Sequence, residues 1–373
     1  MKNSLSFFLH NNIINTPDDK RIAEKILASE RITPDEAFYL FTEADLGLLG
    51  IMASHIKNNK TGKTVYFIQN IHLEPTNICV CNCKFCSYSK KSGKPGAWRL
   101  TLEEISEKIK QISENINEIH ITGGTHPDAT LTEYIHLVKT IRSINPKIHI
   151  KAFSAAELHY VFQKENIKYE DGFRLLIQAG LGSIPGGGAE TFDEEIRKNI
   201  CPDKTSSVEW LNVHAAAHKS GIFSNATMLY GHIESYHHRI DHMMRLRTLQ
   251  DITSGFNAFI PLKFKNQNNP MSELKEVSLL EDMRNYAVSR IFLDNFPHIK
   301  SYWPMLGKEA AQLSLSFGVD DIDGTINDST RIYSMAGAED ATPQMHVEEI
   351  TKIILDAGYN PVERNSDYSA VKN

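Results

Sequence analysis

The chain has 373 residues, of which 41% are hydrophobic and 23% charged, with 14 prolines and 21 glycines. This composition is typical of a globular protein with a large core and excludes a disordered or fibrous chain. The formal net charge is −6 and no basic run is longer than Lys90 and Lys91, so we expect no nucleic-acid partner.

The N-terminal stretch MKNSLSFFLHNN has an apolar run too short for a secretory signal and no cleavage site after it. No stretch approaches the roughly 18 apolar residues of a transmembrane helix. We therefore expect a cytoplasmic protein that does not enter a membrane. In a reducing compartment, an odd number of cysteines is not expected to build a disulfide framework.

Taken in chain order, residues 1–60 are predicted to form a helical cap, and a strand follows at 64–73. The next helix begins with a capping box at Thr101 and Glu104 and has one apolar face. From there helices and strands alternate. The predicted strands after the first are 118–122, 147–153, 181–187, 222–231, 256–264, 290–296 and 313–319. The predicted helices are 101–112, 131–144, 154–166, 206–219, 236–254, 275–289, 305–312 and 344–357.

Eight strands separated by helices predict an α/β fold, a (β/α)₈ TIM-type barrel. We expect the barrel to span residues 61–343, with the helical cap before it. Residues 344–373 are then expected to form a closing helix and a tail packed on the barrel.

The stretch CVCNCKFC holds four of the five cysteines, namely Cys79, Cys81, Cys83 and Cys86. A closed zinc site usually takes ligand pairs from two separated knuckles, and no second cysteine pair occurs downstream. An iron–sulfur cluster is larger, so thiolates from one short loop can each reach a different iron. A [4Fe–4S] cluster with three protein thiolates keeps one iron open, which favours catalysis. Zinc, or an inert group of cysteines, remains the alternative.

The spacing C-x₃-C-x-Φ-C, with Phe85 before the last cysteine, resembles the signature of radical S-adenosylmethionine (SAM) enzymes. The resemblance implies that Cys79, Cys83 and Cys86 bind the [4Fe–4S] cluster and that SAM chelates its open iron. One electron from the cluster would then cleave SAM into methionine and a 5′-deoxyadenosyl radical. Cys81 lies off the pattern, and we interpret it as a bystander on the other side of the loop.

In such barrels the chemistry lies at the C-terminal ends of the strands. Gly123 and Gly124 follow the second strand and are expected to contact the methionine end of SAM, although a plain turn explains them equally well. Glu157 is a candidate for the SAM ribose, but it also completes a Ser-x-x-Glu capping box. Phe85 and Tyr88 complete the predicted SAM contacts, with Tyr88 near the adenine.

Substrate contacts are expected at other strand ends. Three glycines in SIPGGGAE indicate a close approach of the backbone to a ligand. The acidic stretch GVDDIDGT fits a solvated loop, a cation site or part of a substrate pocket. The candidate substrate-binding residues are His126, His232, Lys263, Asp320 and Asp321.

Over residues 20–365 the chain resembles one branch of the superfamily, aminofutalosine synthase of the futalosine route to menaquinone. The stretches that carry this resemblance are EPTNICVCNCKFCSYSK, ITGGTHPD, SIPGGGAE, RKNICPDK, DDIDGT and PVERN. The resemblance implies a transferase that adds the 5′-deoxyadenosyl radical to 3-[(1-carboxyvinyl)oxy]benzoate. The products would be 6-amino-6-deoxyfutalosine, methionine and bicarbonate, and the electron donor would be of the flavodoxin or ferredoxin type.

Three other functions remain open. The first is the related dehypoxanthine futalosine cyclase. The second is a sulfur-inserting enzyme similar to biotin synthase, but it needs a second cluster, and only Cys81 and Cys201 remain for one. The third is a non-catalytic iron–sulfur carrier, which would need neither a barrel nor SAM.

Overall fold

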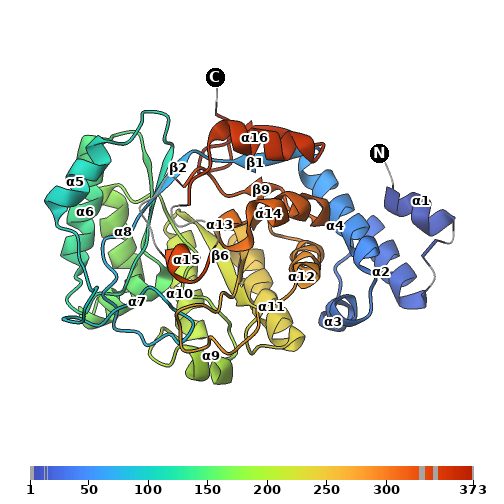
Figure 1. Ribbon diagram of the computed structural model, residues 1–373, viewed down its shortest axis with the longest axis horizontal. Coiled ribbons are helices and arrows are strands. Elements are labelled where there is room, and N and C mark those ends of the chain that lie inside the picture. Colours follow the sequence, from blue (N-terminus) through green and yellow to red (C-terminus); the bar gives the residue numbers. More distant parts are fainter. Residues whose placement is uncertain (1–3, 12, 15, 327–331, 339–342, 372–373) are drawn as a thin grey trace.

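The computed structural model describes residues 4–11, 13–14, 16–326, 332–338 and 343–371, so residues 1–3 of the predicted cap lie outside it. Its centre is a ten-stranded parallel sheet in the order β10-β1-β9-β8-β7-β6-β5-β4-β3-β2 (Figure 1). The strands are β1 (Thr64–Phe67), β2 (Asn70–Leu73), β3 (Glu118–Ile121), β4 (His149–Ala152), β5 (Ser183–Ile184), β6 (Phe223–Tyr230), β7 (Phe256–Lys263), β8 (His298–Ser301), β9 (Asp321–Ile322) and β10 (Asn360–Glu363).

Helices surround this sheet, and Figure 1 shows α5, α6 and α8 on one side of the strands and α1 to α3 at the opposite end of the molecule. The helices are α1 (Ser4–His10), α2 (Pro17–Leu27), α3 (Pro34–Thr42), α4 (Leu46–Thr61), α5 (Leu102–Lys110), α6 (Leu131–Ile144), α7 (Ala155–Lys164), α8 (Tyr169–Ala179), α9 (Glu194–Ile200), α10 (Ser207–Lys219), α11 (Tyr236–Thr253), α12 (Leu279–Phe292), α13 (Trp303–Leu306), α14 (Lys308–Ser314), a 3₁₀ turn (Leu315–Phe317), α15 (Ile332–Met335) and α16 (Val347–Asp356).

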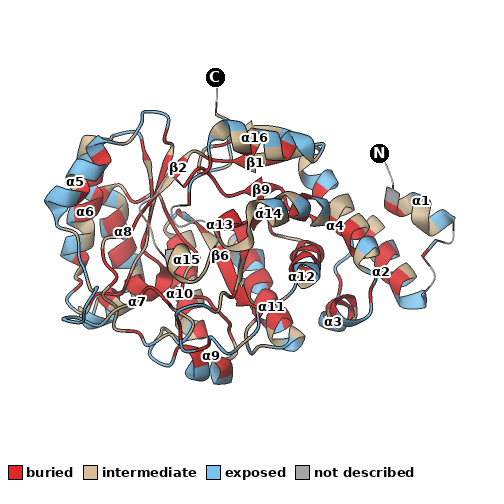
Figure 2. Ribbon diagram, viewed as in Figure 1, coloured by how far each residue is buried: buried red, intermediate tan, exposed pale blue. Residues whose placement is uncertain are grey.

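Local sequence accounts for most of these helices. The capping box predicted at Thr101 is present, since its hydroxyl accepts the Glu104 N–H while the Glu104 carboxylate accepts the Thr101 N–H. Helix α6 starts after an equivalent box and buries Leu137, Val138 and Ile141 against the sheet. Figure 2 shows the result: the inner strands such as β6 and β8 are mostly buried, whereas α5 and α16 keep exposed outer faces.

The sheet is curled, but it differs from the predicted eight-stranded barrel. The strand predicted at 64–73 is two strands, β1 and β2, and β10 was not predicted. Strand β1 pairs with β9 and β10, while β2 pairs only with β3 in the described part of the chain. The segment after β9 reaches across to β2, because the N–H of Thr325 bonds to Ile68 O (3.1 Å) and that of Ile326 to Asn70 Oδ1 (2.9 Å). The two sides of the sheet therefore approach each other without a continuous strand ladder.

Two predicted strands are wrong. Residues 290–296 are the end of α12 and a turn, and residues 313–319 are the end of α14 and the 3₁₀ turn. Both runs contain apolar residues that are buried in helices, such as Ile291, Phe292 and Leu315, and a short apolar run does not distinguish a strand from a buried helix. The strands that replace them, β8 and β9, lie a few residues later and carry charges, Lys300 and Asp321 among them.

No helix in the described ranges is long and apolar enough to span a bilayer.

Candidate active site

The cysteine stretch is the loop that follows β2, and two adjacent glycines after β3 hold its first part. The Gly124 N–H donates to Thr76 O (2.8 Å), and the Val80 N–H donates to Thr125 O (2.9 Å). A Cβ at Gly123 would lie 2.7 Å from Thr76 O, and one at Gly124 only 2.3 Å from Ile78 O. The predicted glycine pair thus lets the backbone approach the cysteine loop closely.

This contact gives a first prediction. Gly124→Ala must displace the backbone just before Cys79, so we expect the variant to retain little iron after anaerobic reconstitution. Gly187→Ala is the control, since its Cβ would meet nothing nearer than Ser154 Cβ at 3.5 Å. Iron content and urea unfolding measure the effect. A Gly124→Ala protein with the iron content of the parent would show that the close approach is unimportant.

The thiols of the loop lie close together. The Cys81 thiol is within hydrogen-bonding reach of Cys79, Cys83 and Asp203 O, and its single proton serves one of them at a time, so Cys81 lies beside the predicted ligands rather than on the other side of the loop. Hydrogen bonding with Cys81 lowers the pKa of Cys79 to about 5, and it also lowers the pKa of Cys83. Burial raises the pKa of Cys86, whose Sγ accepts the Ser89 N–H at 3.4 Å.

Two features that the sequence did not predict hold this loop from outside. The Lys91 ammonium donates to the carbonyls of Cys79, Val80 and Cys81 at 3.1, 2.7 and 3.3 Å. On the other side, the chain around the end of α9 docks on the loop, with Lys84 N–H bonded to Ile200 O at 2.7 Å. Lys91 lies in the basic dipeptide of the sequence, but nothing in that pattern indicates where its side chain points.

The predicted SAM contacts fall into separate places. Gly123, Gly124 and Glu157 line one cavity of about 310 Å³, and His126 lines the same cavity. Tyr88 lines a second cavity of about 530 Å³, and its hydroxyl donates to Thr76 O at 3.2 Å.

Phe85 is half-buried and packs against an apolar cluster that includes Ile196, Ile200 and Cys201. Among the predicted SAM contacts it therefore lies toward α9 rather than beside the two glycines.

Glu157 forms the capping box that the sequence allowed. Its Oε2 accepts the Ser154 N–H (2.8 Å) and the Ser154 hydroxyl (2.6 Å), and the Thr122 hydroxyl lies 3.4 Å away. Burial raises the pKa of Glu157 to about 7 despite these bonds. The capping role is therefore present, and the ribose contact stays a prediction.

The three glycines of SIPGGGAE allow close packing within the protein. A Cβ on Gly186 would lie 2.7 Å from Asn225 O in β6. The Trp210 Nε1–H donates to Gly187 O at 3.2 Å, and Gly188 has a φ of 91°. These contacts account for the glycines without a ligand.

Two of the predicted substrate-binding residues, Lys263 and His232, already have partners within the protein. Lys263 Nζ lies 2.8 Å from Asp282 Oδ2 and donates to Val277 O. His232 is buried, with Nδ1 3.2 Å from Glu234, and burial lowers its pKa. His126 bonds its Nδ1 to the Asp128 N–H at 3.1 Å and lines the cavity of about 310 Å³.

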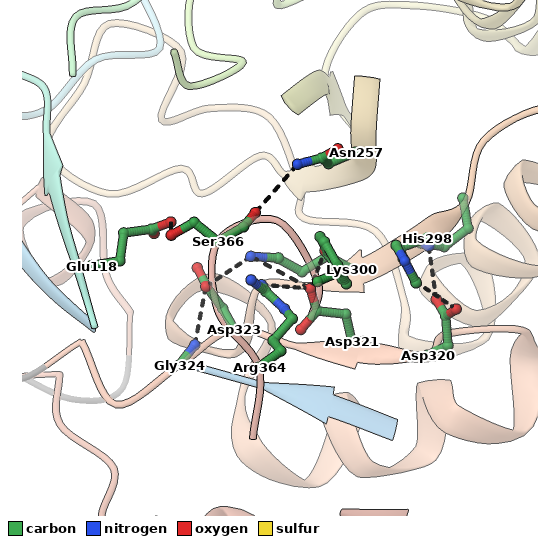
Figure 3. A network of polar contacts seen from close by, with 12 residues as sticks. Glu118, Asn257, His298, Lys300, Asp320, Asp321, Asp323, Gly324, Arg364 and Ser366 are labelled. Carbon is green, nitrogen blue, oxygen red and sulfur yellow. Dashed lines mark hydrogen bonds and ion pairs between the residues drawn. The ribbon is translucent and has the colours of Figure 1, made fainter. Parts of the chain in front are cut away.

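Asp320 and Asp321 are not on a loop after a strand, because β9 begins at Asp321 itself. Asp320 is paired with Arg290 (2.5 Å) and His298 (3.0 Å), and Asp321 with Arg364 (2.8 Å). Figure 3 shows His298 pointing toward Asp320, and Arg364 toward Asp321. Burial alone would raise the pKa of Asp320, but Arg290 and His298 outweigh it, and the pKa lies below its ordinary value.

The network of Figure 3 continues inside the curled sheet. Glu118 forms an ion pair with Lys151 and accepts the Ser366 hydroxyl at 2.7 Å. Lys300 is paired with Asp323 at 3.2 Å. Since these charges are buried and matched with one another, loss of one partner would leave an uncompensated charge in the interior of the sheet.

The cysteine loop fits a [4Fe–4S] cluster. Three thiols come from one loop whose main chain is fixed on both sides, and a backbone N–H already points at Cys86 Sγ. Three thiolates from one short loop suit a cluster, in which each binds a different iron, better than a closed zinc site, which usually takes ligand pairs from two separated segments.

Comparisons with known proteins agree with this site. The family model described as Radical SAM superfamily matches residues 73–246, and one described as CofH/MqnC C-terminal region matches residues 253–373. Aminodeoxyfutalosine synthase of Thermus thermophilus is 42% identical over 94% of this chain and 95% of its own length. The synthase of Streptomyces coelicolor is 36% identical over 95% of this chain and 94% of its own length.

A relative with another name is nearly as similar. The 5-amino-6-(D-ribitylamino)uracil–L-tyrosine 4-hydroxyphenyl transferase of Methanopyrus kandleri is 38% identical over 83% of this chain and 85% of its own length. Among solved structures, methylornithine synthase has a TM-score of 0.73 at 16% identity, covering 91% of this chain and 97% of its own. The hydrogenase maturase HydG of Carboxydothermus hydrogenoformans has a TM-score of 0.74 at 19% identity, covering 98% and 83%. These two show the fold alone.

The cofactors of this superfamily are a [4Fe–4S] cluster and SAM. The chain has the cysteine loop, the curled parallel sheet and relatives above 30% identity over nearly the whole chain. The protein therefore belongs to the radical SAM superfamily, in the group that contains the aminodeoxyfutalosine synthases.

Proposed function

We propose that the protein is an aminodeoxyfutalosine synthase in menaquinone biosynthesis. The reaction joins the 5′-deoxyadenosyl group of SAM to 3-[(1-carboxyvinyl)oxy]benzoate, takes up water, and yields 6-amino-6-deoxyfutalosine, methionine and bicarbonate. The observation that carries the proposal is the 42% identity to the Thermus synthase over 94% of this chain, because it spans both the cysteine loop and the C-terminal region.

In this proposal Cys79, Cys83 and Cys86 hold the cluster. When bound, the cluster supplies the electron that cleaves SAM into methionine and a 5′-deoxyadenosyl radical. The chain's own residues then have to position and shield the reactants, since geometry controls where a radical reacts. The paired glycines fix the cysteine loop, and the cavity of about 310 Å³ beside them offers Glu157 and His126 to a polar ligand.

Of the residues predicted to bind the two carboxylates of the substrate, His126 is the best candidate. Its ring lines that cavity, whereas Lys263 and His232 are matched by Asp282 and Glu234 inside the protein. An unpaired anion is costly to bury, so the substrate needs hydrogen-bond donors at its carboxylates. A reduced flavodoxin or ferredoxin is the proposed electron donor.

We propose that the chain is divided into three parts. Residues 1–60 would cap the curled sheet, residues 61–343 would form the catalytic unit, and residues 344–373 would pack on it. Helices α1 to α4 and α16 lie in the terminal parts of this division.

An isotope label in SAM tests whether the adenosyl group is transferred to the product. The reduced, reconstituted enzyme is incubated with SAM labelled in the adenosine carbons and with 3-[(1-carboxyvinyl)oxy]benzoate, and the products are analysed by mass spectrometry. We expect the label in aminodeoxyfutalosine, with one methionine and one bicarbonate per product. Labelled 5′-deoxyadenosine that matches the product one for one would instead reject covalent transfer and favour a hydrogen-abstracting enzyme such as the cyclase.

The archaeal relatives supply the second candidate. These relatives are named for a 4-hydroxyphenyl transfer between L-tyrosine and 5-amino-6-(D-ribitylamino)uracil, and they are 32–38% identical to this chain. A parallel incubation with those two compounds distinguishes the candidates. Turnover with that pair, and none with the enolpyruvyl compound, would move the assignment to the transferase.

A further inference from the structure

Lys204 is a buried cation that the proposed reaction leaves without a role. It lies in the connection between α9 and α10, and its side chain is 15% exposed. Its Nζ bonds to Glu190 Oε1 at 2.6 Å and lies 5.4 Å from the ring centroid of Phe85. Phe85 is the residue before the last cysteine of the loop, so the ammonium lies on the side of the cysteine loop that the Phe85 ring occupies.

The connection that carries Lys204 is held firmly at both ends. Towards the cysteines, the Cys81 thiol donates to Asp203 O at 3.6 Å, in addition to the bond between Lys84 and Ile200. Away from them, the Arg197 guanidinium donates to the carbonyls of Ala189 and other residues of the glycine-rich loop. The position of the ammonium is therefore fixed with respect to the cysteines.

Lys204 lies beside the cysteine loop, because it lines one cavity of about 580 Å³ together with Val80 and Cys81 of that loop. Its ring contact is with Phe85, which stands between Cys83 and Cys86 in the sequence. A fixed positive charge in a place with little water interacts strongly with nearby negative charge.

We propose that Lys204 is a positioning residue that raises the reduction potential of the [4Fe–4S] cluster, and that Glu190 opposes it as the counter-charge. Reduction adds one negative charge to the cluster, so a neighbouring cation stabilises the reduced state and a neighbouring carboxylate destabilises it. The inference rests on the proposed ligands Cys79, Cys83 and Cys86, but it does not depend on the substrate.

The test is an anaerobic redox titration of the reconstituted protein, in which EPR follows the reduced cluster without SAM or substrate. We expect Lys204→Met to shift the potential to more negative values. At a fixed potential the ratio of reduced to oxidised cluster should fall at least about threefold, which is about 28 mV for one electron. Lys204→Arg should remain near the parent, and Glu190→Gln should shift to more positive values.

Lys84→Met is the matched control. Lys84 lies on the cysteine loop, between Cys83 and Cys86, and its replacement by methionine removes the same charge as Lys204→Met. The side chain of Lys84 is exposed and bonds to Asn199 at 2.9 Å, so water and salt screen its charge. Its potential should equal that of the parent.

Two results would overturn the proposal. One is a Lys204→Met cluster with full iron and the parent's potential; the other is a shift of Lys204→Met and Glu190→Gln in the same direction, which indicates a structural disturbance. If Lys204→Met fails to hold a cluster, the Glu190→Gln variant decides. The proposal is rejected if the reduction potential of Glu190→Gln is not more positive than that of the parent. Failure of the cysteine ligands would show separately as missing iron in the parent protein.

Discussion

Replacing Cys79, Cys83 or Cys86 by alanine is expected to remove the cluster and all SAM-dependent turnover. Each thiolate would bind a different iron, so loss of one leaves a second iron open and the cluster no longer held. The measurements are iron content and visible absorbance after anaerobic reconstitution. Circular dichroism of each variant shows whether the fold is retained.

Cys81→Ala is the matched control within the same loop. The variant should keep most of its iron, because the thiol of Cys81 contacts Asp203 O and its neighbours but lies off the spacing of the three ligands. A Cys81→Ala protein without a cluster would overturn the ligand assignment. So would an alanine variant of any of the three ligands that kept the parent's iron content and absorbance.

Arg290→Met is expected to lower the free energy of unfolding by about 3–5 kcal/mol. Arg290 is fully buried, and it donates to Gly318 O at 2.7 Å and to the Asp320 carboxylate at 2.5 Å. Without it, the Asp320 carboxylate keeps, among the described residues, His298 and the Ile299 N–H as hydrogen-bond partners, and the side chain is fully buried. Urea unfolding of the purified protein, compared with the parent, measures the loss.

Arg174→Met removes an exposed ion pair with Asp171, in which the side chains are 61% and 54% exposed. Its effect should stay under about 1 kcal/mol. Equal stability of Arg290→Met and the parent would mean that the network of Figure 3 contributes nothing to the fold.

Periodicity predicted the outer helices well and the inner strands less well. Helix α6 has the predicted bounds, 131–144, because capping and an apolar stripe both mark it. Strands β8 and β9 were missed because their interior faces carry Lys300 and Asp321, whose partners come from elsewhere in the chain. A strand with charges on its buried face has no apolar alternation to detect.

The same limit applied to the site. Spacing was enough to propose three cysteines of four as cluster ligands, since the motif is local. It could not show that Lys91 caps the loop carbonyls or that Lys204 lies behind Phe85, because these contacts depend on tertiary structure. For the aspartates of DDIDGT the sequence left a solvated loop, a cation site and a substrate pocket open, but Arg290 and Arg364 pair with Asp320 and Asp321 in the interior.

The position of β1 has a consequence for synthesis of the protein. Tyr66 of β1 pairs with Asp321 on one side and with Val362 on the other, so both neighbours of this early strand lie some hundreds of residues downstream. A nascent chain on the ribosome can fold β2 to β8 in sequence, but β1 has no partner strand until β9 emerges. Such long-range pairing is slow, because a large loop must close first. Pairing of β1 is therefore a late step of folding, and this early strand stays unpaired until β9 and β10 are available.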